Sequence, residues 1–355
     1  MKLPRITILI TLLLTTPAAA QLQITPPATT PSAAPEKQKA KPPAPAKKKE
    51  AAPKASPSPK PSPSPKPATV IPAPPADNPN VDLVYGAYQR GQYKTAFELA
   101  TARAQAGDPK AMTMLGELYS NAMGIRRDYA KAAEWYKRAA DAGDREAMFA
   151  LAMLRISGRG GTVDKGEAVK LMASAAKLGE PKAAYNLALL YLDGQTLPQD
   201  VKRSAELLRQ AADAGLPEAQ YALATFYKEG TGVAKDAERA VRLLQAASLA
   251  DNVDAEVEYA IAMFNGTGTP KNQPAAVALL RKASRQGSAV AQNRLAWVLI
   301  NGVGASVDKV EGFKWHLVAK TAGKGDPELD KQLSDLPAED RAKAEAAAKK
   351  WLGTK

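Results

Sequence analysis

Residues from about 111 to 326 repeat one pattern of apolar and polar positions every 36 residues. An alanine recurs at this spacing in all six copies, at Ala111, Ala147, Ala183, Ala219, Ala255 and Ala291. Four residues later comes a mostly large apolar column, formed by Leu115, Leu151, Leu187, Leu223, Tyr259 and Leu295. A regular period of this length indicates a chain built from copies of one small structural unit.

Each unit is predicted to be a hairpin of two helices. In the first unit Leu115, Leu118 and Tyr119 have the spacing of one apolar helix face, and Ala132, Trp135 and Ala139 form a second stripe further on. Beside the large column runs a small one, which would let the second helix approach closely. Its members are Gly116, Ala152, Ala188, Ala224, Ala260 and Ala296. Since a lone hairpin cannot bury its apolar face, the units are expected to stack.

The loop between the two helices raises a question of chemistry. In "KEGTGVAKD" (228–236) two glycines precede a lysine, as they do in loops that hold phosphate. However, the loop recurs in every unit, reads "DGQTLPQD" in 193–200, and is never followed by a Lys-Ser/Thr pair. We therefore expect a structural turn, in which glycine ends the first helix and an Asp or Asn caps the second. The capping column is Asp128, Asp164, Asp200, Asp236, Asn272 and Asp308.

The unit "AMTMLGELYSNAMGIRRDYAKAAEWYKRAADAGDREA" (111–147) resembles a Sel-1-like repeat, a relative of the tetratricopeptide repeat. The resemblance covers six units over 111–326. It implies an all-α, right-handed α/α solenoid of about six 36-residue hairpins. Residues 81–110 resemble a tetratricopeptide unit that caps the N-terminal end, and 327–355 are expected to form a C-terminal capping helix.

The first 80 residues differ from the repeats. Residues 1–20 have a charged start, an apolar run of about 11 residues and a small-x-small end, which is typical of a signal peptide and too short for a membrane span of roughly 20 residues. Residues 21–80 are rich in Pro, Ala and Lys and are expected to be a disordered linker. We therefore expect an exported bacterial protein that is periplasmic and has no transmembrane span after cleavage.

Charge and composition narrow the class of partner. The first 80 residues hold 11 Lys/Arg and 3 Asp/Glu, which leaves 38 and 33 for the rest of the chain. The repeats are thus only mildly basic and lack the concentrated positive footprint of a nucleic-acid-binding protein. For the linker two interpretations stay open, a plain spacer or a basic tether that contacts anionic envelope polymers. With no cysteine in the chain, disulfides and thiolate chemistry are excluded.

Few residues are candidates for chemistry. His316 is the only histidine and lies in a largely apolar column, so we expect it to be packed and hydrogen-bonded, with a pH sensor as the alternative. A histidine triad or multi-histidine metal site is excluded by count. Most carboxylates are explained as helix caps or exposed helix faces. We predict no enzyme, and no catalytic residue, metal site or cofactor, while an unrecognised hydrolase stays the third alternative for function.

A binding surface is the stronger prediction. In tetratricopeptide-like solenoids the first helices line the concave face, where peptides dock. The large side chains on the first helices of this chain are therefore candidates for partner binding, with packing between units as the alternative. They are Phe149, Met153, Tyr185, Leu189, Tyr221, Ile261 and Trp297. The resemblance implies a scaffold, adaptor or regulator that binds a protein, and a structural factor tethered to the cell wall by the linker is the second alternative.

Overall fold

The computed structural model describes residues 82–353, and within this range every regular element is an α-helix. The predicted signal peptide and linker lie outside the described residues. The helices of the repeats are α3 Pro109–Asn121, α4 Tyr129–Asp141, α5 Arg145–Ser157, α6 Lys165–Lys177, α7 Pro181–Asp193, α8 Val201–Asp213, α9 Pro217–Glu229, α10 Ala237–Leu249, α11 Val253–Asn265, α12 Gln273–Arg285, α13 Ala289–Asn301 and α14 Lys309–Thr321. At the two ends lie α1 Leu83–Gln89, α2 Tyr93–Gln105, α15 Pro327–Ser334 and α16 Ala338–Gly353.

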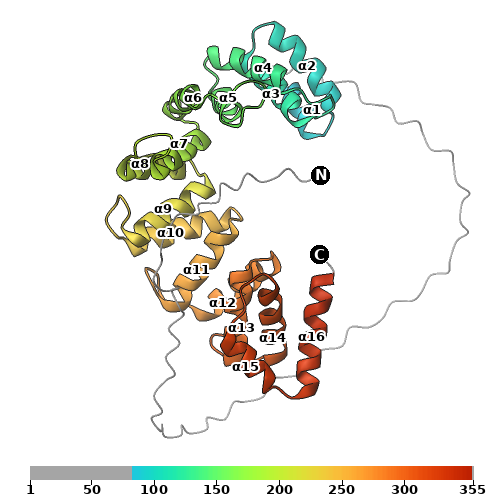
Figure 1. Cartoon of the computed structure of the whole chain (residues 1–355), viewed down its shortest axis with the longest axis vertical. Helices are drawn as coiled ribbons and strands as arrows, with labels where there is room; N and C mark the ends of the chain where they lie inside the picture. The colour runs from blue at the N-terminus through green and yellow to red at the C-terminus, as the bar shows by residue number, and fades with distance from the viewer. Residues whose placement is uncertain (1–81, 354–355) are drawn as a thin grey trace, which may run out of the picture. The chain divides into compact units, whose positions relative to one another are not determined.

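Successive helices pack as antiparallel hairpins that stack on one another, as Figure 1 shows. Each odd-numbered helix from α3 to α13 packs on the helix that follows it. Each even-numbered helix then packs on the first helix of the next hairpin. The prediction of an all-α solenoid of repeated helical hairpins is thus confirmed.

The small column lies where the two helices of a hairpin cross. Its alanines are at most 1% exposed, and the large leucines of the neighbouring column are buried beside them. At Gly116 an added Cβ would lie 2.5 Å from a carbon of the Tyr136 ring on α4. Small side chains are therefore needed at these positions because the second helix occupies the space.

The loop of each repeat begins with a residue in the left-handed conformation. Gly230 has φ 80° and ends α9, and glycine takes this conformation at little cost. In the first repeat Ala122 stands at the same position with φ 57°. The fold thus keeps the left-handed turn even where the sequence does not supply glycine.

The Asp/Asn column caps the second helix in all six repeats. Asp236, for example, accepts a hydrogen bond from the Arg239 amide at 2.9 Å, while its own amide donates to the Tyr227 carbonyl at 3.0 Å. One residue therefore satisfies a free amide of the second helix and a terminal carbonyl of the first. The other capping residues are Asp128, Asp164, Asp200, Asn272 and Asp308.

The second glycine of the loop touches the preceding repeat. An added Cβ at Gly232 would lie 2.6 Å from the carbonyl oxygen of Val201, the first residue of α8. Gly160 and Gly268 meet the corresponding residues of α4 and α10 in the same way. The two glycines of the loop are therefore explained by helix termination and by close packing between repeats, as expected for a structural turn.

The C-terminal segment adds two helices, α15 and α16, in the range where the sequence predicts one capping helix. The longer helix, α16, packs along α14, where the Trp315 and Trp351 rings meet edge to face with centroids 5.1 Å apart. Lys314 lies over both rings. These contacts cover the last repeat at the end where no further hairpin follows within residues 82–353.

Candidate functional site

The seven side chains predicted to bind a partner occupy the fifth and ninth positions of the odd-numbered helices, and we call the surface they form the odd-helix face. All seven are half-buried. Phe149, Tyr185 and Tyr221 pack against the core cluster around α7 to α9, and Met153 packs against Ala152 and Met172. Packing between repeats thus accounts for part of their burial and leaves part of each side chain accessible.

Trp297 has a further role at the end of the array. Its indole Nε1 donates a hydrogen bond to Asp326 Oδ2 at 2.9 Å. Asp326 also caps α15 by accepting from the Glu328 amide at 2.9 Å. The tryptophan therefore helps to hold the short helix α15, which the sequence alone did not indicate.

Carboxylates lie next to the two tyrosines of this surface. Burial first, and then the negative charges of Glu258, Asp254 and Glu229, together raise the pKa of Tyr221 to about 12. The pKa of Tyr185 is also raised, first by burial and then by Glu218. A phenol that is harder to ionise reports both the loss of water and the negative charge nearby.

Five of these residues form what we call the tyrosine–carboxylate strip, namely Tyr185, Tyr221, Glu218, Glu229 and Asp254. Glu218, Glu229 and Asp254 are exposed. Sequence reasoning found the tyrosines but missed the carboxylates. A signal was present, because Glu218 and Asp254 are 36 residues apart and each stands three residues before the column that holds Tyr221.

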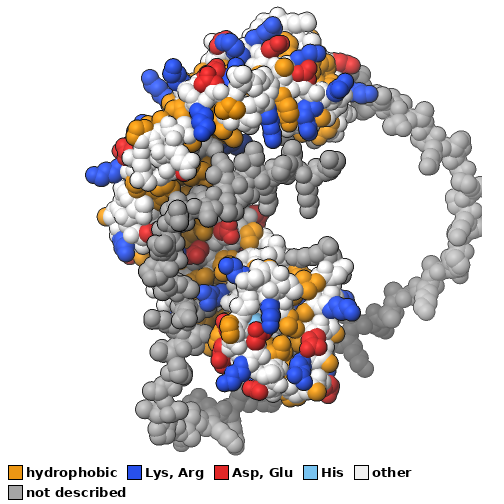
Figure 2. Space-filling model, in the orientation of Figure 1, with side chains coloured by type: hydrophobic (Ala, Val, Ile, Leu, Met, Phe, Trp, Pro, Cys, Tyr) orange, Lys and Arg blue, Asp and Glu red, His pale blue; other side chains and the backbone are white. Residues whose placement is uncertain are grey.

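The surface charge is mixed elsewhere. On the face shown in Figure 2, lysine and arginine side chains are interspersed with aspartate and glutamate over the helices. Many of them form exposed ion pairs, such as Lys137 with Asp141 at 2.9 Å. This distribution resembles an ordinary solvated surface rather than a single field that would attract a polyanion.

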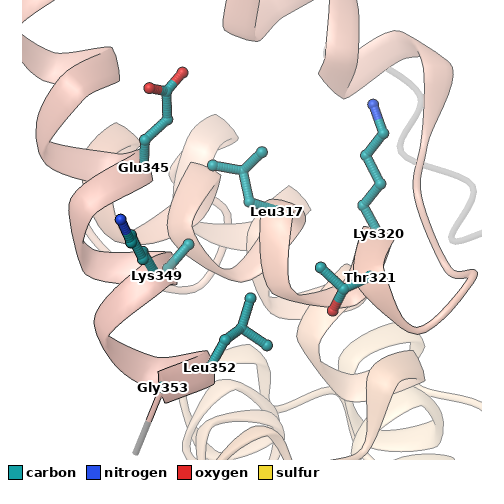
Figure 3. Close-up of a pocket in the computed structure, with 8 residues that line it drawn as sticks. Leu317, Lys320, Thr321, Glu345, Lys349, Leu352 and Gly353 are labelled. Atoms are coloured by element: carbon teal, nitrogen blue, oxygen red, sulfur yellow. The ribbon is translucent and has the colours of Figure 1, made fainter.

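A groove at the C-terminal end was not predicted from the sequence. It has a volume of about 750 Å³ and is lined by residues of α14 and α16. In Figure 3, Leu317 and Leu352 point into it, while Lys320 and Lys349 stand at its edges. The groove is wide open, and its lining combines residues from two helices that are separated in the chain by α15, which is why no local motif revealed it.

His316 is wholly buried beside this groove. Its Nε2 lies 2.8 Å from Asp330 Oδ1 on α15, and Lys320 Nζ lies 2.8 Å from the same oxygen. Lys320 and then His316 lower the pKa of the Asp330 carboxyl. The geometry is that of a packed, hydrogen-bonded histidine that ties α15 to the last repeat.

Neither a metal centre nor a membrane-spanning helix is found in residues 82–353. No group of three or more His, Cys, Asp or Glu side chains there is arranged to hold a metal ion. No helix in the same range is both long and apolar enough to cross a bilayer.

Comparison with known proteins identifies the repeats. The family model of the Sel1 repeat matches residues 109–144, 145–180, 181–216, 217–252, 253–288 and 289–324. A Sel1 repeat protein from Oxalobacter formigenes is 27% identical, with a TM-score of 0.60 over 67% of this chain and 98% of its own. A protective antigen of uropathogenic Escherichia coli with the same repeat fold is 24% identical, with a TM-score of 0.52 over 73% and 64%. No curated protein matches the chain.

Proposed function

Because this chain belongs to the Sel1 repeat family, whose repeats in general form a frame for protein–protein interaction, we propose that it is a periplasmic adaptor or regulator that binds a partner protein on the odd-helix face. Function on such a frame is carried by variable side chains at constant positions. The supporting observation is that the odd-helix face keeps half-buried aromatic and aliphatic side chains accessible to a partner.

The physical case rests on what each position does for the fold. The alanine and leucine columns form the core, and the Asp/Asn column caps helices. Tyr221 and Ile261 belong to none of these columns, and although Tyr221 packs against the core, both still expose part of a large apolar side chain. Aromatic side chains of this kind are the usual anchors of protein interfaces because they bury much area at low entropic cost.

The periplasmic location is supported by the sequence of residues 1–20, which has the pattern of a signal peptide. Fractionation of cells that express the full chain with a C-terminal tag would test it. Recovery in the periplasmic fraction is expected, whereas recovery only with cytosolic markers would contradict this part of the proposal.

Site-specific photo-crosslinking in cells would test the surface. A photoreactive residue at position 189 or 261, on the odd-helix face, should give a discrete cross-linked product. The matched controls are the exposed positions 134 and 245 on the even-numbered helices α4 and α10, which should not give that product. If the control positions give the same product and 189 and 261 do not, the partner binds elsewhere and the proposed surface is wrong.

A further inference from the structure

We propose that the loops of the first two repeats bind an acidic segment of a partner protein, by pairing two arginines with aspartate or glutamate carboxylates of that segment. The residues are Arg127, Tyr129 and Arg159, which we call the arginine–tyrosine cluster. The cluster shares no residue with the odd-helix face, so the inference goes beyond the proposed function and adds a second surface to it.

The fold brings guanidinium groups from two repeats to one aromatic ring. Tyr129 is the first residue of α4, and the guanidinium carbons of Arg127 and Arg159 lie 5.7 Å and 5.4 Å from the centroid of its ring. Arg127 belongs to the loop of the first repeat and Arg159 to the loop of the second. An added Cβ at Gly160 would lie 2.1 Å from the Tyr129 carbonyl oxygen. The second loop is therefore packed against the start of α4, which holds Arg159 next to the ring.

The charge of the two arginines is not neutralised within the described part of the chain. Arg127 and Arg159 are exposed, and neither forms an ion pair with another residue of 82–353. Asp128 and Asp164, the carboxylates nearest to them in the sequence, accept amide hydrogen bonds at the starts of α4 and α6. Two cations held at one ring without a counterion repel each other, and an anion bound between them would relieve this repulsion.

The fold does not require these charges. At the position of Arg159 the other five repeats have Met, Gln, Thr, Thr and Val, and at the position of Arg127 they have Val, Gln, Lys, Lys and Val. A loop still joins the two helices in each of those repeats. Arg126, which is also exposed, stands where the others have Thr, Pro, Ala, Pro and Ser. Charges that one junction carries and the frame can do without are the kind that serve recognition.

The geometry favours a carboxylate-bearing segment as the ligand. A guanidinium group presents a planar fork of N–H donors that matches the two oxygens of a carboxylate. Contact with the tyrosine ring orders each arginine before a ligand arrives, which lowers the entropic cost of binding. The positive charge is also local, because lysines and arginines elsewhere on the face in Figure 2 are interspersed with carboxylates. A long polyanion would need a continuous positive field along its length, whereas a short acidic segment does not.

Direct binding of short peptides to the full chain tests the inference. The probes are fluorescent peptides of repeated Glu-Gly units, with Gln-Gly units as the uncharged control. We expect the glutamate peptide to bind more tightly than the glutamine peptide, and its affinity to fall as salt is raised, because exposed charges are screened. Equal affinity for the two peptides would overturn the inference.

Double variants locate the site. Arg127→Gln with Arg159→Gln should weaken binding of the glutamate peptide roughly fivefold to tenfold, as expected for the loss of two accessible ion pairs. The matched control is Arg242→Gln with Arg285→Gln, at exposed positions on α10 and α12. The two variants have the same net charge, so attraction of the peptide to the basic chain as a whole decreases equally in both. Equal losses of affinity would show that net charge, and not the cluster, binds the peptide.

Variants of Tyr129 test the role of the ring. Tyr129→Leu keeps an apolar side chain but removes the ring, and should weaken binding about twofold to fivefold. The other five repeats have Lys, Val, Ala, Gln and Lys at this position, so the fold tolerates the change. Tyr129→Phe keeps the ring and should bind like the parent. Parental affinity in Tyr129→Leu would contradict the part of the inference that assigns the ring an ordering role.

A phosphate polymer is the competing ligand. If polyphosphate of the same charge binds more tightly than the glutamate peptide, and loses that advantage in the Arg127→Gln, Arg159→Gln variant, the cluster binds phosphate and the choice of an acidic protein segment is wrong. Crosslinks at positions 189 and 261 report on the odd-helix face alone. The failure of either proposal is therefore seen in different variants.

Discussion

At the scale of single residues, the loop glycines are required for two different reasons, a left-handed backbone conformation and close packing against the preceding repeat. Gly230 is needed for its left-handed backbone, whereas Gly232 is needed both for its backbone and for the space that its missing side chain leaves to Val201. The sequence predicted the first role from the pattern of helix endings. It could not predict the second, because a contact with the preceding repeat has no local signal.

Replacing Gly232 with alanine should therefore cost more than backbone strain alone. Gly215 is a matched control, because its φ of 85° is equally left-handed but no atom lies within 4 Å of an added Cβ. We expect Gly232→Ala to lower the free energy of unfolding by about 1–3 kcal/mol more than Gly215→Ala does. Urea unfolding of both variants measures the difference, and equal losses would show that the contact with Val201 is unimportant.

At the scale of helices, the hairpin was predictable because each column has one physical reason. Leu115, Gly116 and Asp128 mark the apolar face, the helix crossing and the cap, and the structure places all three as expected. The candidate site was only half predictable. The tyrosines stand out by size, but Glu218 and Asp254 look like ordinary exposed helix residues until the neighbouring hairpin brings them close to a phenol.

Ala152 and Ala188 are fully buried where the two helices of a hairpin cross, so larger side chains there are expected to destabilise the fold. Leucine at either position would force the two helices of a hairpin apart and should lower stability by about 1–3 kcal/mol. Ala173, which is exposed on α6, is the control and should tolerate leucine. Thermal melts report the result, and parental melting temperatures for both core variants would show that the helices do not cross there.

At the scale of the whole repeat array, stability depends on how its ends are held. The last repeat is covered by α15 and α16, and Asp330 joins α15 to Lys320 and His316 of α14. The groove of Figure 3 lies at the same end, and neither feature was visible in the sequence. Both depend on how the chain folds back after the repeat pattern stops, at "TAGKGDPEL" (321–329).

The Asp330 contact should make this end sensitive to acid. Lys320 and His316 lower the pKa of Asp330 in the folded chain. Its contribution to stability is therefore fully present above the unfolded pKa of about 4 and is lost as pH falls through the lower folded value. Asp330→Asn keeps the shape but removes the charge, so this variant should lose less stability than the parent between neutral and strongly acidic pH.

Melting temperatures across that pH range test the prediction. The parent should lose on the order of 2 °C more than Asp330→Asn on acidification. Asp335→Asn, an exposed aspartate at the end of the same helix, should behave like the parent. A parent and an Asp330→Asn variant with parallel pH profiles would contradict the role given to this carboxylate.

The second loop glycine has a consequence for how force would travel through the repeats. At Gly124, Gly160, Gly232, Gly268 and Gly304 the loop lies directly against the backbone or Cβ of the first residue in the second helix of the preceding hairpin. The third repeat has Thr196 at this place, without a left-handed φ. Five of the six junctions between hairpins therefore share the same close contact of a loop glycine with the preceding hairpin. The junction before the third repeat has no glycine at this place. Under tension we expect the five junctions that share this contact to separate at similar forces, and the junction at Thr196 to separate at a different force.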